Sequence, residues 1–137
     1  MLYLRRKDYD IILNYAVKGL PNEACGLIAG KVSGEDKHIE KVYLLTNADE
    51  SNEHFSMDPK EQLAAVKDIR ENGLSLLGNF HSHPESPARP SEEDKRLAFD
   101  TKAEYLILSL LNREEPILKA FLINAEKEVT EEPIGII

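Results

Sequence analysis

The chain has 137 residues, the usual size of one domain, and carries 25 Asp and Glu against 17 Lys and Arg, a net charge of −8. This acidic balance argues against nucleic acid and anionic lipid as partners, and the single cysteine, Cys25, excludes an internal disulfide and a Cys-x-x-Cys motif. Because no apolar run approaches the roughly 20 residues of a membrane span, and the N-terminus lacks the charge order of a secretory signal, we expect one cytoplasmic domain over residues 1–137.

The first part of the chain predicts a helix followed by two strands. Apolar residues at helical spacing indicate a helix over about residues 7–19. Strands follow at about 25–30, which is apolar throughout, and at about 39–47. The polar, glycine-containing stretch 33–36 is typical of the turn between them.

The next segment predicts a short strand and a second helix. Phe55 and Met57 alternate with polar neighbours, which favours a strand near 52–57. The helix should begin at Asp58-Pro59, because aspartate is a good cap and proline suits the first helical position, and end at Asn72-Gly73. The residues expected to face inward are Leu63, Val66 and Ile69.

The second half of the chain predicts strands, with one short helix. A mostly apolar strand leads into His81, a proline-rich loop covers 85–90, and a short helix runs from Ser91 to about Phe99. Strands should close the chain at about 105–110, 117–123 and 126–130. Together these elements predict an α/β or α+β domain, with a curved mixed sheet flanked by helices.

The most informative stretch is His81-Ser82-His83-Pro84, at the end of the predicted strand. Alternate side chains of a strand share a face, so His81 and His83 should point the same way where Pro84 stops the strand. Two imidazoles and one carboxylate, which Asp94 can supply, form a common catalytic zinc set that leaves one position for water.

This pattern resembles the signature of the JAMM (MPN+) metalloproteases, His-x-His-Pro, six residues, Ser, two residues, Asp. The segment Pro21–Gly30 resembles the Glu-x-x-Gly setting of that family's glutamate, here Glu23. The resemblance implies a JAMM/MPN domain with a cytidine-deaminase-like layout and one zinc ion per chain, bound by His81, His83 and Asp94. It implies that Glu23 is not a ligand but takes a proton from the attacking water and passes it to the leaving amine.

Two further residues near the motif have a predicted role. Ser91 can cap the helix that carries Asp94 and can also donate a hydrogen bond to the oxyanion formed at the amide carbonyl. Cys25 is interpreted as a small buried core residue, with a contact to the zinc site or a redox brake on it as the alternative. His54 is expected to line the cleft, and no residue is assigned to substrate binding.

The resemblance implies hydrolysis of peptide or isopeptide bonds at the Gly-Gly tail of a ubiquitin-like or sulfur-carrier protein. Isopeptide cleavage and trimming of a carrier's C-terminus both remain open. Such a tail could add as a strand to segment 52–57. The alternative is a non-catalytic binding scaffold of the MPN type, which predicts a gap in the motif, and none is present. A zinc deaminase is set aside because it requires more than one cysteine.

Overall fold

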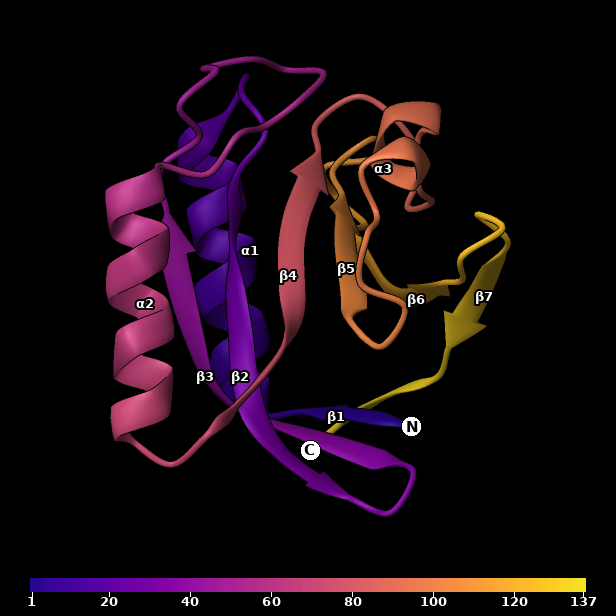
Figure 1. Ribbon diagram of the computed structural model, residues 1–137. Coiled ribbons are helices and arrows are strands. Elements are labelled where there is room, and N and C mark those ends of the chain that lie inside the picture. The colour runs from indigo at the N-terminus through magenta and orange to yellow at the C-terminus, as the bar shows by residue number, and fades with distance from the viewer.

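The computed structural model describes all residues, 1–137, and contains one curved mixed sheet of eight strands with three helices (Figure 1). The strand order is β7-β6-β5-β4-β2-β3-β1-β8, so the α/β architecture predicted from the sequence is confirmed. In chain order the elements are β1 (Leu2–Leu4), α1 (Arg6–Gly19), β2 (Cys25–Ser33), β3 (Asp36–Leu45), α2 (Pro59–Glu71), β4 (Ser75–His83), α3 (Glu92–Arg96), β5 (Glu104–Ser109), β6 (Ile117–Ile123), β7 (Val129–Glu132) and β8 (Ile134–Ile136).

The sheet curls until its two edges approach each other. β7 and β8 lie at opposite ends of the strand order, yet only Pro133 separates them in the chain. The amino group of Met1, beside β1, also forms an ion pair of 2.7 Å with Glu132 of β7. The curvature expected from the sequence is therefore imposed by the chain connection between the edges.

The helices α1 and α2 pack against opposite faces of the sheet (Figure 1). α1 buries Ile12 and Ala16 in the main core, which holds Phe80 of β4. α2 buries Ala65 with Cys25 and others in a smaller core over β2 and β3. α3 lies over the β5 side of the same face as α2, which leaves β4 between them. No helix has both the length and the hydropathy of a membrane span.

Several details differ from the sequence predictions. The helix predicted to reach about Phe99 ends at Arg96, and the strand predicted at about 126–130 is β7, Val129–Glu132. β1 and β8 were not predicted, because three residues are too few to show an alternating pattern. Segment 52–57 forms no strand: only Met57 makes an isolated bridge, to Asn47. Leu63 was expected to face inward but is 72% exposed, because the buried side of α2 is centred on Ala65 and Ile69.

Candidate metal centre

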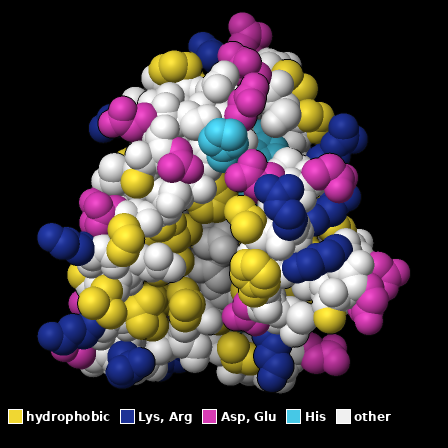
Figure 2. Space-filling model, turned by 45° about the horizontal axis from the view of Figure 1, so that its top comes forward, with side chains coloured by type: hydrophobic (Ala, Val, Ile, Leu, Met, Phe, Trp, Pro, Cys, Tyr) yellow, Lys and Arg dark blue, Asp and Glu magenta, His cyan; other side chains and the backbone are white.

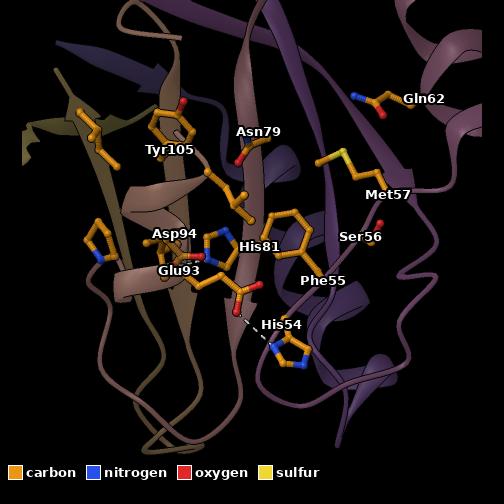
Figure 3. A pocket seen from close by; sticks show the side chains of 14 residues that line it. His54, Phe55, Ser56, Met57, Gln62, Asn79, His81, Glu93, Asp94 and Tyr105 are labelled. Atoms are coloured by element: carbon orange, nitrogen blue, oxygen red, sulfur yellow. Dashed lines mark hydrogen bonds and ion pairs between the residues drawn. The ribbon is translucent and has the colours of Figure 1, made fainter. Parts of the chain in front are cut away.

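Three side chains converge at the end of β4. His81 and His83 are alternate residues of this strand and are 2% and 5% exposed. Their Nε2 atoms lie 3.1 Å apart, and each lies 3.2 Å from Oδ2 of Asp94 in α3. Figure 3 shows His81 and Asp94 facing each other at one end of the pocket.

The three atoms have the spacing and chemistry of zinc ligands. Ligand atoms of a tetrahedral zinc ion, bound at about 2.0–2.1 Å, stand about 3.3 Å apart, close to the 3.1–3.2 Å sides of this triangle. The other ring nitrogen of His83, Nδ1, lies 2.9 Å from the carbonyl oxygen of Pro87. Donation to this carbonyl places the ring proton on Nδ1 and leaves the Nε2 lone pair free to bind a metal. The residues present therefore fit the ion.

A capping box fixes the carboxylate of Asp94. Ser91 Oγ accepts a hydrogen bond from the Asp94 N–H at 3.0 Å, and Asp94 Oδ2 accepts one from the Ser91 N–H at 2.9 Å. Without a metal, burial alone would raise the pKa of Asp94, but hydrogen bonds from the protonated rings of His81 and His83 outweigh it and hold this pKa below its usual range. The side chain is therefore anionic at neutral pH, as a metal ligand must be.

Glu23 lies beside this triangle without being part of it. It precedes β2, which pairs with β4 in antiparallel register, Cys25 opposite His81. The Glu23 N–H donates a hydrogen bond to the Ser51 carbonyl at 2.7 Å, and the residue as a whole is only 5% exposed. Burial raises the pKa of Glu23 to about 8. A carboxyl with this pKa can both take up and release a proton near neutral pH.

A glycine permits the close packing of β2 behind Glu23. A Cβ at Gly26 would lie 2.1 Å from the carbonyl oxygen of Tyr43 and 2.2 Å from the ring of Phe80. Any larger residue would push β2 away from β3 and β4. The glycine of the Glu-x-x-Gly segment thus lets β2, which follows Glu23, pack closely between β3 and β4.

A cavity of about 390 Å³ opens beside His81. Figure 2 shows this face hollowed between hydrophobic side chains, with histidine and acidic side chains near one end. His54 Nδ1 and Glu93 Oε2 meet at 3.2 Å between its two walls, and the ring of Phe55 stacks on His81 with centroids 4.7 Å apart (Figure 3). Asn79, two residues before His81 on β4, also lines the cavity. Its remaining lining comprises Ser56, Met57, Gln62, Pro90, Asp94, Leu97, Tyr105, Ile107 and Ile123.

The structure brings the ligand atoms of His81, His83 and Asp94 within 4.8 Å of one another, and Ser91 is hydrogen-bonded to Asp94. Glu23 is buried just before β2, where the charges of His83 and Asp94 act on its carboxyl. His54 lines the cavity, as expected. Cys25 is fully buried among Leu27, Leu45 and Ala65, and burial raises the pKa of its thiol to about 12. The thiol is therefore protonated and enclosed in the core.

Sequence reasoning missed three contributors to the site. They are the Pro87 carbonyl beside His83, the Phe55 ring stacked on His81, and Asn79 of β4, which lines the cavity next to His81. The proline-rich loop could have indicated the contact of the Pro87 carbonyl, because this loop follows His83 directly in the chain. Nothing in the sequence connects Phe55 with His81, since their contact is purely tertiary.

Comparison with known proteins adds a family to this geometry. The profile of the family described as prokaryotic homologs of the JAB domain matches residues 5–134. The CysO-cysteine peptidase of Mycobacterium tuberculosis is 29% identical over 137 residues, which cover 100% of this chain and 92% of that protein. A probable TtuB-protein conjugate cleaving protease of Thermus thermophilus is 35% identical over 95 residues, 69% of this chain and 61% of that protein.

A solved structure is similar over nearly the whole chain. The solution structure of a protein from Desulfitobacterium hafniense superimposes with a TM-score of 0.91 at 55% identity. The match covers 99% of this chain and 92% of that one. The fold described above is therefore shared by a protein of clearly related sequence.

Proposed function

Since the chain belongs to the family of prokaryotic homologs of the JAB domain, we propose that it is a zinc-dependent hydrolase of peptide or isopeptide bonds. The observation that carries the proposal is the triangle formed by His81, His83 and Asp94, with the buried carboxyl of Glu23 beside it. The proposed substrate is the C-terminal tail of a ubiquitin-like or sulfur-carrier protein. The names of the two relatives support this class, because one is a CysO-cysteine peptidase and the other is named a probable TtuB-protein conjugate cleaving protease.

His81, His83 and Asp94 would hold the zinc ion and leave one coordination position open. Zinc bound in this way supplies Lewis acidity toward the substrate carbonyl and hydroxide at neutral pH. The protein contributes the fixed orientation of the three ligands. The Pro87 carbonyl holds His83, and the capping box holds Asp94.

Glu23 is the proposed proton carrier. In its buried position the carboxyl has a pKa of about 8, and an adjacent positive charge favours the ionised form that a base requires. It would take a proton from the attacking water and release it to the nitrogen of the leaving amine. The hydrogen bond from its N–H to Ser51 fixes its backbone during both steps.

Ser91 is the proposed donor to the oxyanion. Its Oγ accepts the Asp94 N–H at 3.0 Å, and its hydroxyl proton is not used in any hydrogen bond within the protein. The same hydroxyl can therefore cap α3 and donate to the charge that develops on the carbonyl oxygen. One such donor typically contributes about 10²–10³ in kcat.

The cavity is the proposed location of the substrate tail. It lies beside His81 and is open enough for a main chain with small side chains, such as a Gly-Gly end. Segment 52–57 lines it but lacks the strand that the sequence predicted, so strand addition there is not part of the proposal.

The proposal is tested by incubating the protein with two substrate panels, Gly-Gly-ended fusions and carrier adducts, with products identified by mass spectrometry. We expect cleavage directly after the second glycine, abolished by a chelator and restored by zinc. Release of the residue or adduct that follows the Gly-Gly end would show C-terminal trimming, whereas cleavage of a carrier attached to a lysine side chain would show isopeptide hydrolysis. Tight binding of a carrier without cleavage would instead support the non-catalytic scaffold.

A further inference from the structure

The two histidines of the site differ in what their second ring nitrogen contacts. Nδ1 of His83 has the Pro87 carbonyl at 2.9 Å. Nδ1 of His81 is buried and has no hydrogen-bond partner, although Nε2 of the same ring faces Asp94. A neutral histidine that binds a metal through Nε2 carries its proton on Nδ1, and metal-binding histidines almost always donate this proton to an acceptor.

The strand register limits which residues can supply that acceptor. The cross-strand neighbours of His81 are Cys25 on β2 and Ile107 on β5. The isoleucine side chain has no polar atom, and the thiol of Cys25 is a weak acceptor whose Sγ contacts the Leu45 carbonyl instead. Phe55 stacks on the face of the His81 ring, whereas the Nδ1–H of His81 points outward in the plane of that ring. Phe55 therefore cannot accept this hydrogen bond.

Asn79 offers a side-chain acceptor on the same face of β4 as His81. It stands two residues before His81, which places the two side chains on one face with their Cα atoms about 6.6 Å apart. Its Oδ1 is also buried without a hydrogen-bond partner. An acceptor that lacks a donor therefore lies next to a donor that lacks an acceptor, and both residues line the same cavity (Figure 3).

We propose that Asn79 is a positioning residue for the metal site, whose Oδ1 accepts the Nδ1 proton of His81 when Nε2 binds the metal. A rotation of the Asn79 side chain is needed to form the bond, and the cavity beside it gives the amide room to turn. The bond would fix the tautomer and the ring orientation of His81, as the Pro87 carbonyl does for His83. This inference rests on the proposed zinc site.

Zinc affinity in the absence of substrate tests the proposal. The dissociation constant is measured by competition with a chromophoric chelator for the wild type, Asn79→Leu, Asn79→Asp and the control Gln62→Leu. Loss of such an outer partner typically weakens metal binding about 10–100-fold, which we expect for Asn79→Leu. Asn79→Asp keeps an acceptor and should bind at least as tightly as the wild type. Gln62 lines the same cavity from α2, so its substitution should leave the affinity unchanged.

The outcomes separate this inference from the proposed function. Asn79 has no positioning role if the wild type binds zinc and the dissociation constant of Asn79→Leu lies within about twofold of the wild-type value. The same conclusion follows if Gln62→Leu weakens zinc binding as much as Asn79→Leu does. If the wild type binds no zinc, the proposed function itself is wrong.

A second measurement does not depend on the folding of Asn79→Leu. In zinc-loaded protein the Nδ1 proton of His81 should give a slowly exchanging NMR signal, and Asn79→Asp should move it downfield because a charged acceptor makes a stronger bond. A signal that stays in place in Asn79→Asp would overturn the inference.

Discussion

Ala24 and Ser82 are joined by two hydrogen bonds, although 58 residues separate them. The Ser82 N–H donates to the Ala24 carbonyl at 2.9 Å, and the Ala24 N–H donates to Ser82 Oγ at 2.8 Å. Ser82 lies between the two histidines, and Ala24 follows Glu23. This pair therefore sets the position of the proposed base relative to the proposed ligands.

Replacing Ser82 should uncouple these positions without removing a ligand. In Ser82→Ala the buried Ala24 N–H loses its acceptor, which costs about 1–3 kcal/mol of unfolding free energy. We expect lower kcat at unchanged zinc content, because β2 is held less firmly against β4. Denaturant unfolding, zinc analysis and turnover check these effects, with Ser82→Thr as the variant that keeps the hydroxyl. Zinc loss in proportion to the loss of turnover would contradict the expected division of roles.

Glu23→Gln separates proton transfer from metal binding. The amide has nearly the same shape but cannot carry the proton, so kcat should fall by about 10²–10⁴-fold while one zinc ion per chain is retained. Glu53→Gln is a matched control, because this glutamate is exposed and stands in the neighbouring loop. Turnover of Glu23→Gln at the wild-type rate would show that another group is the base.

Ser91 has two proposed roles that respond to different substitutions. Ser91→Ala removes the cap of α3, at about 0.5–2 kcal/mol of stability, and the proposed oxyanion donor, at about 10²–10³ in kcat. Ser91→Thr keeps the hydroxyl and should preserve most of both. Thermal unfolding reports the first effect and steady-state kinetics the second. A stability loss without any change in kcat would leave Ser91 as a cap alone.

The metal-free protein should lose stability relative to Glu23→Gln as the pH rises. The pKa of Glu23 is about 8 in the folded state against an ordinary value of 4.5, so the folded state holds this proton more tightly than the unfolded state. Its contribution to stability is complete below about pH 4.5 and is lost as the pH rises through about 8. We expect the difference between the two proteins to change by up to about 1.4 kcal/mol per pH unit in this window. Urea unfolding in the presence of a chelator measures it, and a difference independent of pH would contradict the burial of this carboxyl.

The triangle of His81, His83 and Asp94 could be predicted from the sequence, because the positions of these side chains depend on residues close to them in the chain. The spacing of His81 and His83 on one strand fixes their common direction, and Ser91 and Asp94 form a capping box within one turn of helix. Glu23 could be proposed only from the family resemblance, since the register that brings it to β4 depends on the packing of two distant strands.

His54 was expected in the cleft, but most other contacts around the site could not be predicted from the sequence. Phe55 and Met57 alternate like residues of a strand, but Phe55 uses its apolar ring to stack on His81, where no strand is available to pair with it. β1 and β8 form because the curled sheet brings their short segments together, which no local pattern records. Leu63 shows the converse case, an apolar residue at helical spacing that lies on the exposed side of α2.

The central claim, that His81, His83 and Asp94 bind one zinc ion and leave a position open, is tested most directly by zinc-edge X-ray absorption on the purified protein. We expect one zinc ion per chain with two imidazole nitrogens and two oxygens at about 2.0–2.1 Å, and loss of this signal in His81→Ala. The control His38→Ala should keep it, because His38 lies in β3 and stacks on Tyr3. A sulfur ligand at about 2.3 Å, or the absence of stoichiometric zinc after equilibration with the ion, would contradict the account.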